Sequence, residues 1–183
     1  MDSVLNQIRN FADRAHGDQL RKYSTERYIV HPVRVMETCR KYDDRLPILA
    51  AALLHDVLED TTTKTGEMLE FLNSVMSHAE AKKTLSLVVE LTDVYVKTAY
   101  PKWNRHTRKQ KELDRIAQTS ADAQTIKYAD ILDNTAEITR NDPDFAPRYL
   151  RECLEILKRA TKGNQELSQK AFESVRGELE ALR

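Results

Sequence analysis

The chain has 183 residues, of which 29 are basic and 29 acidic, so its formal charge at pH 7 is zero. This length suits one domain that buries a core without disulfides. The balanced charge argues against general attraction to nucleic acid or to a membrane surface. We therefore expect neither of those partners, and nothing in the composition selects an oligomeric state.

The N-terminus and the cysteines indicate the compartment. The first residues lack a basic stretch followed by an apolar one, and no apolar run approaches the roughly 18 residues that span a membrane. Cys39 and Cys153 lie in apolar patterns typical of helices, which favours reduced thiols in the core. A cytoplasmic protein is expected.

The predicted fold class is all-α. Apolar residues recur every three or four positions along nearly the whole chain, and no stretch keeps the alternation of a strand. The connections are too short to divide the chain, so one domain is expected over residues 1–183. In chain order, the predicted helices are residues 3–16, 32–42, 46–60, 65–75, 79–92, 104–117, 121–140, 143–162 and 165–182.

Two connections carry further expectations. The polar segment 17–30 contains Arg21 and Lys22, and we expect it to run over the surface and form one wall of a site. Asp142-Pro143 is predicted to begin a helix, because the carboxylate can cap it and proline is tolerated at the first helical position.

The most informative pattern is the pair His55-Asp56 in an otherwise apolar run. On a helix over 46–60, His55 would lie above Glu59 and Asp56 above Asp60, so all four would point into one cavity. Buried charge needs a partner, and a divalent cation is a common one. The alternative is a stack of solvated charges at the end of a helix.

His31 and Asp130 also lie in apolar surroundings. His31 precedes Pro32, which holds it extended so that its imidazole can face inward, although it could instead be a cap or a core residue. An unpaired carboxylate at Asp130 would be costly, and a salt bridge to Lys127 is the alternative to metal binding.

Together these residues form a donor set compatible with Mn²⁺, Fe²⁺ or Zn²⁺. The candidate metal ligands are His31, His55, Asp56 and Asp130. A metal site with open positions polarises a phosphoryl oxygen and lowers the pKa of water, so phosphoester hydrolysis is the natural chemistry.

Candidate substrate contacts follow the basic segment between residues 102 and 115. Arg105, Arg108 and Lys109 share one helical face there, which suits phosphate binding, and a solvated face is the alternative. Asn134 lies one turn after Asp130 and either faces the same cavity or is exposed.

The remaining histidines are left outside the predicted site. His78 and His106 are expected to face solvent, and His16 either caps the first helix or lines the site.

Four segments together closely resemble the hydrolase domain of RelA/SpoT homologues, within the HD-domain phosphohydrolases. They are residues 15–22, 28–32, 51–61 and 126–130. Their order and spacing are most similar to the stand-alone small alarmone hydrolases of the metazoan SpoT-homologue type. The resemblance covers nearly the whole chain and implies a single HD-domain helical bundle of about eight to ten helices around a metal site. The chain is too short for an added synthetase domain, so a bifunctional enzyme is not expected.

The resemblance also implies an activity and residue roles. The expected enzyme is a Mn²⁺-dependent 3′-pyrophosphohydrolase that converts guanosine tetra- or pentaphosphate to GDP or GTP and pyrophosphate. Its metal ligands correspond to the four residues given above. Its Glu-Asp pair, which acts on the attacking water and the leaving group, corresponds to Glu59 and Asp60. Its substrate contacts correspond to Arg21, Lys22, Asn134 and Tyr149.

Three departures from the family pattern bear on specificity for guanine, and the first of them concerns the wall near the base. Residues 23–27 lack the usual glycine and proline, Tyr128 replaces a leucine, and residues 131–133 replace a more basic stretch. The alternatives are therefore a phosphatase for another nucleotide, such as a 3′-pyrophosphorylated adenine nucleotide or NADPH at its 2′-phosphate, and a module that binds alarmone without cleaving it. Glu59 and Asp60 beside the ligands favour an enzyme.

Overall fold

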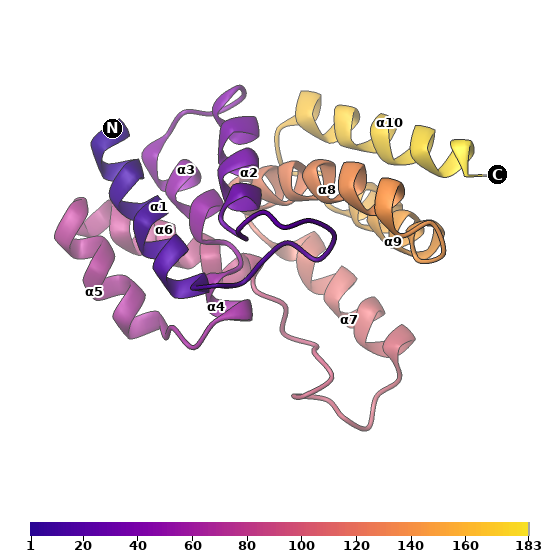
Figure 1. Cartoon of the computed structure of the whole chain (residues 1–183), viewed down its shortest axis with the longest axis horizontal. Coiled ribbons are helices and arrows are strands. Elements are labelled where there is room, and N and C mark those ends of the chain that lie inside the picture. The colour runs from indigo at the N-terminus through magenta and orange to yellow at the C-terminus, as the bar shows by residue number, and fades with distance from the viewer. Residues whose placement is uncertain (183) are drawn as a thin grey trace.

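The computed structural model describes residues 1–182 and confirms the all-α prediction (Figure 1). Over these residues the chain forms ten helices and no strand, with one isolated bridge between Leu20 and Arg27. The helices are α1 (Asp2–His16), α2 (Val30–Arg40), α3 (Leu46–Leu54), α4 (Val57–Asp60), α5 (Thr65–Val75), α6 (His78–Leu91), α7 (Arg105–Gln118), α8 (Ala121–Asn141), α9 (Ala146–Arg159) and α10 (Gln165–Ala181).

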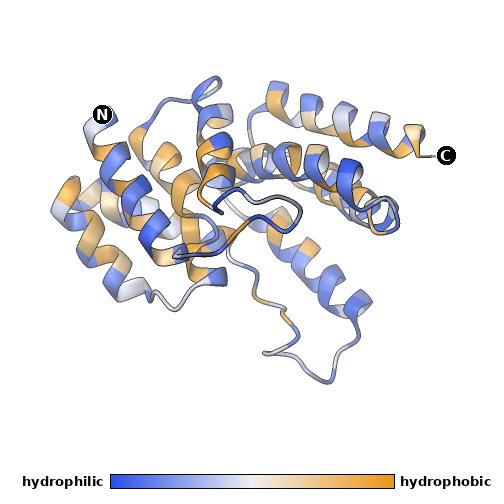
Figure 2. Ribbon diagram, viewed as in Figure 1, coloured by the Kyte–Doolittle hydropathy of each residue, from blue (hydrophilic) through white to orange (hydrophobic). Residues whose placement is uncertain are grey.

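Helix α3 forms the centre of one half of the molecule. Its sequence is apolar throughout, and every residue from Ile48 to Leu54 is buried. Figure 2 shows its continuous apolar colouring, and α1, α2, α6 and α8 all pack against it. Burial of this much apolar surface makes α3 a rigid support for whatever follows its C-terminal end.

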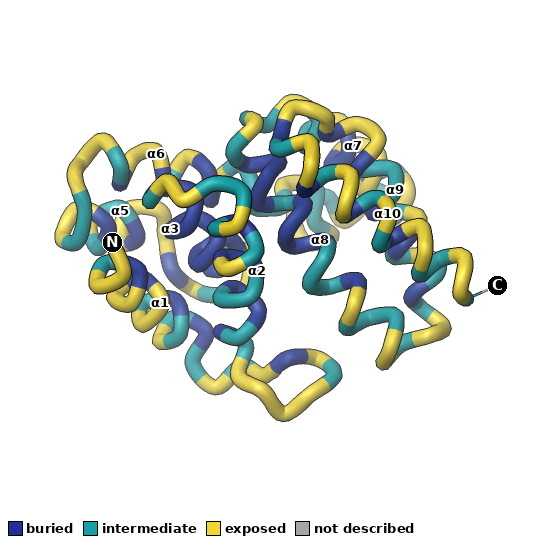
Figure 3. The backbone as a smooth tube through the Cα atoms, turned by 90° about the horizontal axis from the view of Figure 1, so that it is seen from above, coloured by how far each residue is buried: buried dark blue, intermediate teal, exposed yellow. Residues whose placement is uncertain are grey.

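Helix α8 joins the two halves. It packs against α2 and α3 on one side and against α9 and α10 on the other. Figure 3 shows buried residues along α8 as it passes between these groups. Ser120 caps its start by accepting the N–H of Ala123. Helix α8 therefore lies between α2 on one side and α9 on the other.

The prediction of one unbroken helix over 46–60 is wrong. α3 ends at Leu54 and α4 begins at Val57, with His55 and Asp56 in the turn between them. Adjacent residues of a regular helix point about 100° apart. The two predicted ligands therefore lie in a turn at the end of a buried helix and not within one regular helix.

The predicted helix start at Asp142-Pro143 is also wrong. α8 continues to Asn141, and α9 begins at Ala146 with Pro147 in its first turn. The Asp142 carboxylate still accepts the N–H of Phe145 at 3.2 Å, so it stabilises the turn between the two helices.

Tyr128 is fully buried between α8 and the α9–α10 connection. Its hydroxyl donates to the carbonyl of Ala160 at 2.5 Å and accepts the N–H of Gly163 at 3.3 Å. A Cβ at Gly163 would lie only 2.6 Å from Cε2 of Tyr128, so glycine is required by this close approach. The tyrosine that replaces the family's leucine therefore positions α10.

Both cysteines are buried and unpaired, as predicted. Among residues 1–182, no helix combines the length and the apolar character that crossing a membrane requires.

Candidate active site

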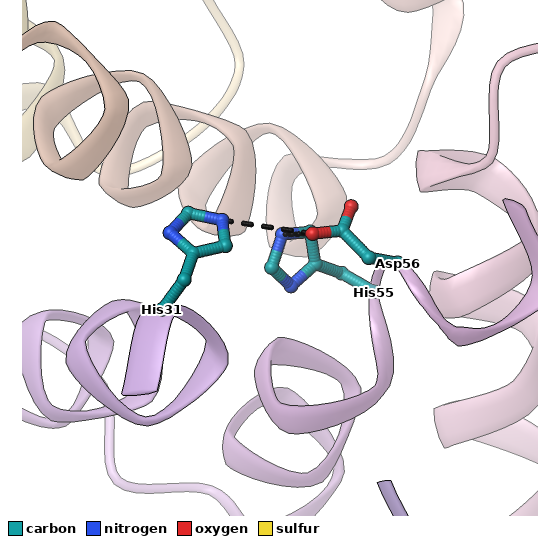
Figure 4. A group of neighbouring side chains, drawn as sticks. All are labelled: His31, His55 and Asp56. Carbon is teal, nitrogen blue, oxygen red and sulfur yellow. Dashed lines mark ion pairs between the residues drawn. The ribbon is translucent and has the colours of Figure 1, made fainter. Parts of the chain in front are cut away.

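Four side chains converge where α2, the α3–α4 turn and α8 meet. Nε2 of His31 lies 3.6 Å from Oδ2 of Asp56 and 3.2 Å from Oδ1 of Asp130. Nε2 of His55 lies 3.0 Å and 3.7 Å from the same two oxygens. Figure 4 shows the two imidazoles and the Asp56 carboxylate directed toward one another. Donor atoms of His31, His55 and Asp56 all lie within 4.8 Å of one another, a spacing at which they could hold a metal ion.

Each imidazole is held through Nδ1. His55 Nδ1 lies 2.8 Å from the carbonyl oxygen of Ala52, and His31 Nδ1 lies 2.7 Å from Oδ2 of Asp133. An Nδ1–H that donates to these acceptors leaves a lone pair on Nε2, which is the form that binds metals. Nε2 of His55 is buried, and although it lies 3.0 Å from Oδ2 of Asp56, it forms no hydrogen bond with any described residue. A divalent cation fits this donor set because it would satisfy that atom.

The carboxylates give this cluster a negative electrostatic field. Burial opposes charging of His55, but Asp56 and Asp130 raise its pKa well above the ordinary value. Burial likewise opposes ionisation of Asp130, but Lys127 and the two histidines hold its pKa well below the ordinary range. The ionised carboxylates thus call for positive charge between them, which a bound cation supplies.

Two residues that the sequence analysis left without a role complete the cluster. Asp133 holds His31 and is itself bound by Arg34, whose Nε donates to Oδ1 at 2.7 Å. The hydroxyl of Tyr28 donates to Oδ2 of Asp56 at 2.6 Å. The spacing of Asp133 from Asp130, three residues along one helix, was an available signal for the first. A tyrosine in a polar loop gave no comparable signal for the second.

Glu59 and Asp60 lie at the exposed end of α4. Oε2 of Glu59 accepts the N–H of Asp93 at 3.0 Å. Partial desolvation, followed by the nearby Asp93 carboxylate, raises the pKa of Glu59 to about 7. Desolvation and the charge of Asp56 also raise the pKa of Asp60. Glu59 therefore changes protonation near neutral pH, as acid–base chemistry requires.

A cavity of about 520 Å³ opens beside Asp130 between α7, α8 and α9. This volume lies within the range of small-molecule binding sites. Four of the predicted substrate contacts line it, namely Arg105, Lys109, Asn134 and Tyr149. Its other walls include the apolar side chains of Ile138 and Ile156, so cations and apolar surface are presented to the same space.

The other three predicted substrate contacts do not line this cavity. Arg21 is buried, forms an ion pair with Glu137 and donates to Oδ1 of Asn134 at 3.0 Å. The Lys22 side chain is 70% exposed and forms an ion pair with Asp142. Arg108 donates to the carbonyl of Trp103. Only Arg21 therefore reaches the site, through Asn134.

Histidines outside the cluster follow the predictions in part. His78 and His106 are exposed, as expected. His16 is buried, and its ring lies against that of Tyr28 with centroids 4.5 Å apart. It therefore supports Tyr28, the residue of the segment 17–30 that donates a hydrogen bond to Asp56.

The fold and this histidine–aspartate cluster define an HD-domain protein. The HD domain family matches residues 28–135, which include all four converging side chains, and the chain belongs to this family. Human guanosine-3′,5′-bis(diphosphate) 3′-pyrophosphohydrolase MESH1 is 30% identical over 176 residues, which cover 94% of this chain and 90% of the human protein.

Two further comparisons agree with this assignment. A probable guanosine-3′,5′-bis(diphosphate) 3′-pyrophosphohydrolase of Mycoplasma pneumoniae is 26% identical over 84% of this chain and 21% of its own length. The solved structure of a metazoan SpoT ortholog that hydrolyzes ppGpp superposes with a TM-score of 0.80 at 24% identity, covering 96% of this chain and 95% of the other. This superposition shows the shared fold, and the match to the human protein confirms the resemblance found in the sequence.

Proposed function

We propose that this protein, as one hydrolase domain over residues 1–183, removes the 3′-pyrophosphate of guanosine tetra- or pentaphosphate. The products would be pyrophosphate and GDP or GTP. The observation that carries this proposal is the cavity of about 520 Å³ beside four converging metal-donor side chains. The name of the human relative, which matches over 94% of this chain, supports the choice of substrate.

The metal would be held by His31, His55, Asp56 and Asp130. Mn²⁺ is the ion that the family resemblance favours, and the donor set also suits Fe²⁺ or Zn²⁺. A bound divalent ion polarises a phosphoryl oxygen and makes water more acidic.

Glu59 and Asp60 would carry the proton transfers. Glu59 accepts a proton from the attacking water, whose oxygen forms a bond to the phosphorus attached to the ribose 3′-oxygen. The bond between that phosphorus and the 3′-oxygen breaks, and Asp60 supplies a proton to the oxygen. The pKa of Glu59, raised to about 7, supports its role because both of its forms are then accessible near neutral pH, and the raised pKa of Asp60 favours the protonated form that a proton donor needs.

The cavity walls would hold the rest of the nucleotide. Arg105 and Lys109 would bind phosphates, Asn134 the ribose and Tyr149 the base. Arg21 would act by holding the Asn134 amide, to which it donates at 3.0 Å.

Lys22 and Arg108 would reach only those phosphates that extend beyond the cavity.

The two buried thiols suit a reducing compartment, so we place the reaction in the cytoplasm.

The test is to incubate the Mn²⁺-loaded protein with guanosine tetraphosphate and resolve the products by anion exchange, beside an Asp56→Ala variant. GDP and pyrophosphate from the wild type alone would support the proposal. Turnover of a 3′-pyrophosphorylated adenine nucleotide or of NADPH in its place would reassign the substrate. Binding of guanosine tetraphosphate without any product would indicate a non-catalytic module.

A further inference from the structure

Lys127 lies between the metal-ligand cluster and the cavity. It precedes Asp130 by one turn of α8, and its Nζ lies 2.8 Å from Oδ2 of Asp130. The other oxygen of that carboxylate, Oδ1, faces the cluster, 3.2 Å from Nε2 of His31, and accepts the Asn134 amide at 2.6 Å. A single carboxylate therefore joins the predicted metal centre to a lysine.

The ammonium group of Lys127 retains hydrogen-bonding capacity. Among residues 1–182, the only acceptor for its Nζ is Asp130, although an ammonium has three protons to donate. The side chain is 24% exposed and lines the cavity. A largely buried ammonium normally uses its donors, so the remaining protons are available to a ligand in the cavity.

The charge of the site calls for a cation at this position. Two neutral imidazoles and two carboxylates neutralise a bound divalent ion, so the donor set itself leaves no positive charge for an anionic substrate. The cavity cations Arg105 and Lys109 are paired with Glu152 and Asp93 respectively. Of the cations lining the cavity, Lys127 alone forms an ion pair with a predicted metal ligand in the described chain.

We propose that Lys127 binds a non-bridging oxygen of the phosphoryl group under attack and stabilises the negative charge there. The lysine donates a hydrogen bond and keeps its proton, so no covalent bond to it forms or breaks. This assignment rests on the proposed phosphohydrolase function and adds a substrate-contacting residue to it.

The variants Lys127→Met and Lys127→Arg test the assignment, because the first removes the charge at similar length and the second keeps it. Lys83→Met is the matched control, since Lys83 forms a Lys–Asp pair of 2.9 Å with Asp122 and lines no part of the cavity. Circular dichroism establishes that each variant is folded. Bound Mn²⁺ is measured by atomic emission.

Phosphate binding is measured from the broadening of the ³¹P resonance of inorganic phosphate by the Mn²⁺-loaded protein. We expect Lys127→Met to bind Mn²⁺ with the wild-type stoichiometry but to bind phosphate about tenfold more weakly, as loss of a charge-assisted hydrogen bond implies. Its kcat on guanosine tetraphosphate should fall by about 100-fold. Lys127→Arg should recover part of both losses.

Two results would overturn the proposal. The first is unchanged phosphate binding by folded, Mn²⁺-loaded Lys127→Met. The second is a Met variant that loses Mn²⁺ and regains full phosphate binding and turnover in excess Mn²⁺, because Lys127 would then serve Asp130 alone. A third result concerns only the proposed function. If the wild type binds phosphate through Lys127 but does not hydrolyse guanosine tetraphosphate, the proposed function is wrong and the role of Lys127 in phosphate binding stands.

Discussion

His31 on α2 and Asp133 on α8 are joined by a hydrogen bond, with Nδ1 of the imidazole 2.7 Å from Oδ2 of the carboxylate. The bond turns Nε2 of His31 toward the other three predicted ligands. Partners of this kind fix the tautomer of a metal-binding histidine and increase its basicity.

Asp133→Asn should therefore weaken Mn²⁺ binding by about 10- to 100-fold, the usual effect of removing such a partner. Isothermal titration calorimetry of the metal-free protein measures the change. Asp114→Asn is the control, because this exposed carboxylate pairs with Arg159 at 2.7 Å on the surface. Equal Mn²⁺ affinities for both variants would show that Asp133 does not contribute to metal binding.

Glu59→Gln should keep stoichiometric Mn²⁺ but lower kcat by about 10²- to 10⁴-fold, because the amide cannot accept the proton of water. In the wild type, kcat/KM should rise with pH through about 7, the pKa of Glu59, as the carboxylate forms. The variant should lack this rise. Loss of one equivalent of metal from Glu59→Gln would instead make Glu59 a ligand.

The raised pKa of Glu59 also predicts that the free energy of unfolding depends on pH. The pKa of Glu59 is about 7 in the folded protein and near 4.5 when unfolded, so the folded state holds the proton more tightly. Its contribution to the free energy of unfolding is complete below pH 4.5 and is lost as pH rises through about 7. Urea titrations with EDTA present should show wild-type stability falling relative to Glu59→Gln between these pH values. A difference that stays constant with pH would contradict the assigned shift.

Gly163→Ala should destabilise the protein by about 1–3 kcal/mol through overpacking. The added Cβ would lie 2.6 Å from Cε2 of Tyr128 and 2.9 Å from the backbone nitrogen of Thr125. Gly177→Ala is the control, because a Cβ there meets nothing within 4 Å and alanine favours the helix interior by about 1 kcal/mol. The midpoint of thermal unfolding should fall for Gly163→Ala and rise for Gly177→Ala. An unchanged midpoint for Gly163→Ala would mean that α10 can move to accommodate the added Cβ without loss of stability.

The convergence of the candidate metal donors could be predicted because each is a polar residue in an apolar stretch. His55, Asp56 and Asp130 all follow positions that the helical pattern assigns to the core. Such side chains need partners, so their convergence followed from physical chemistry and from the family resemblance together.

The break at His55 could not be predicted from local propensity. The residues from Ala51 to Asp60 favour a helix throughout, whereas His55 Nδ1 binds the Ala52 carbonyl, and packing around α3 determines where the chain turns. Tertiary contacts also determine which groups the basic residues of α7 bind. Arg105 meets Glu152 on α9, whereas Arg108 turns back to the Trp103 carbonyl, although both lie on the predicted basic face.

The converging donors come from chain segments far apart in sequence, on α2, at the α3–α4 turn and on α8. An unfolded chain does not hold them together, since closing such long loops is entropically costly. A divalent ion would therefore bind the native state almost exclusively, and the free energy of unfolding would grow as RT ln(1 + [M²⁺]/Kd). The resistance of this protein to heat would then report the free metal concentration around it.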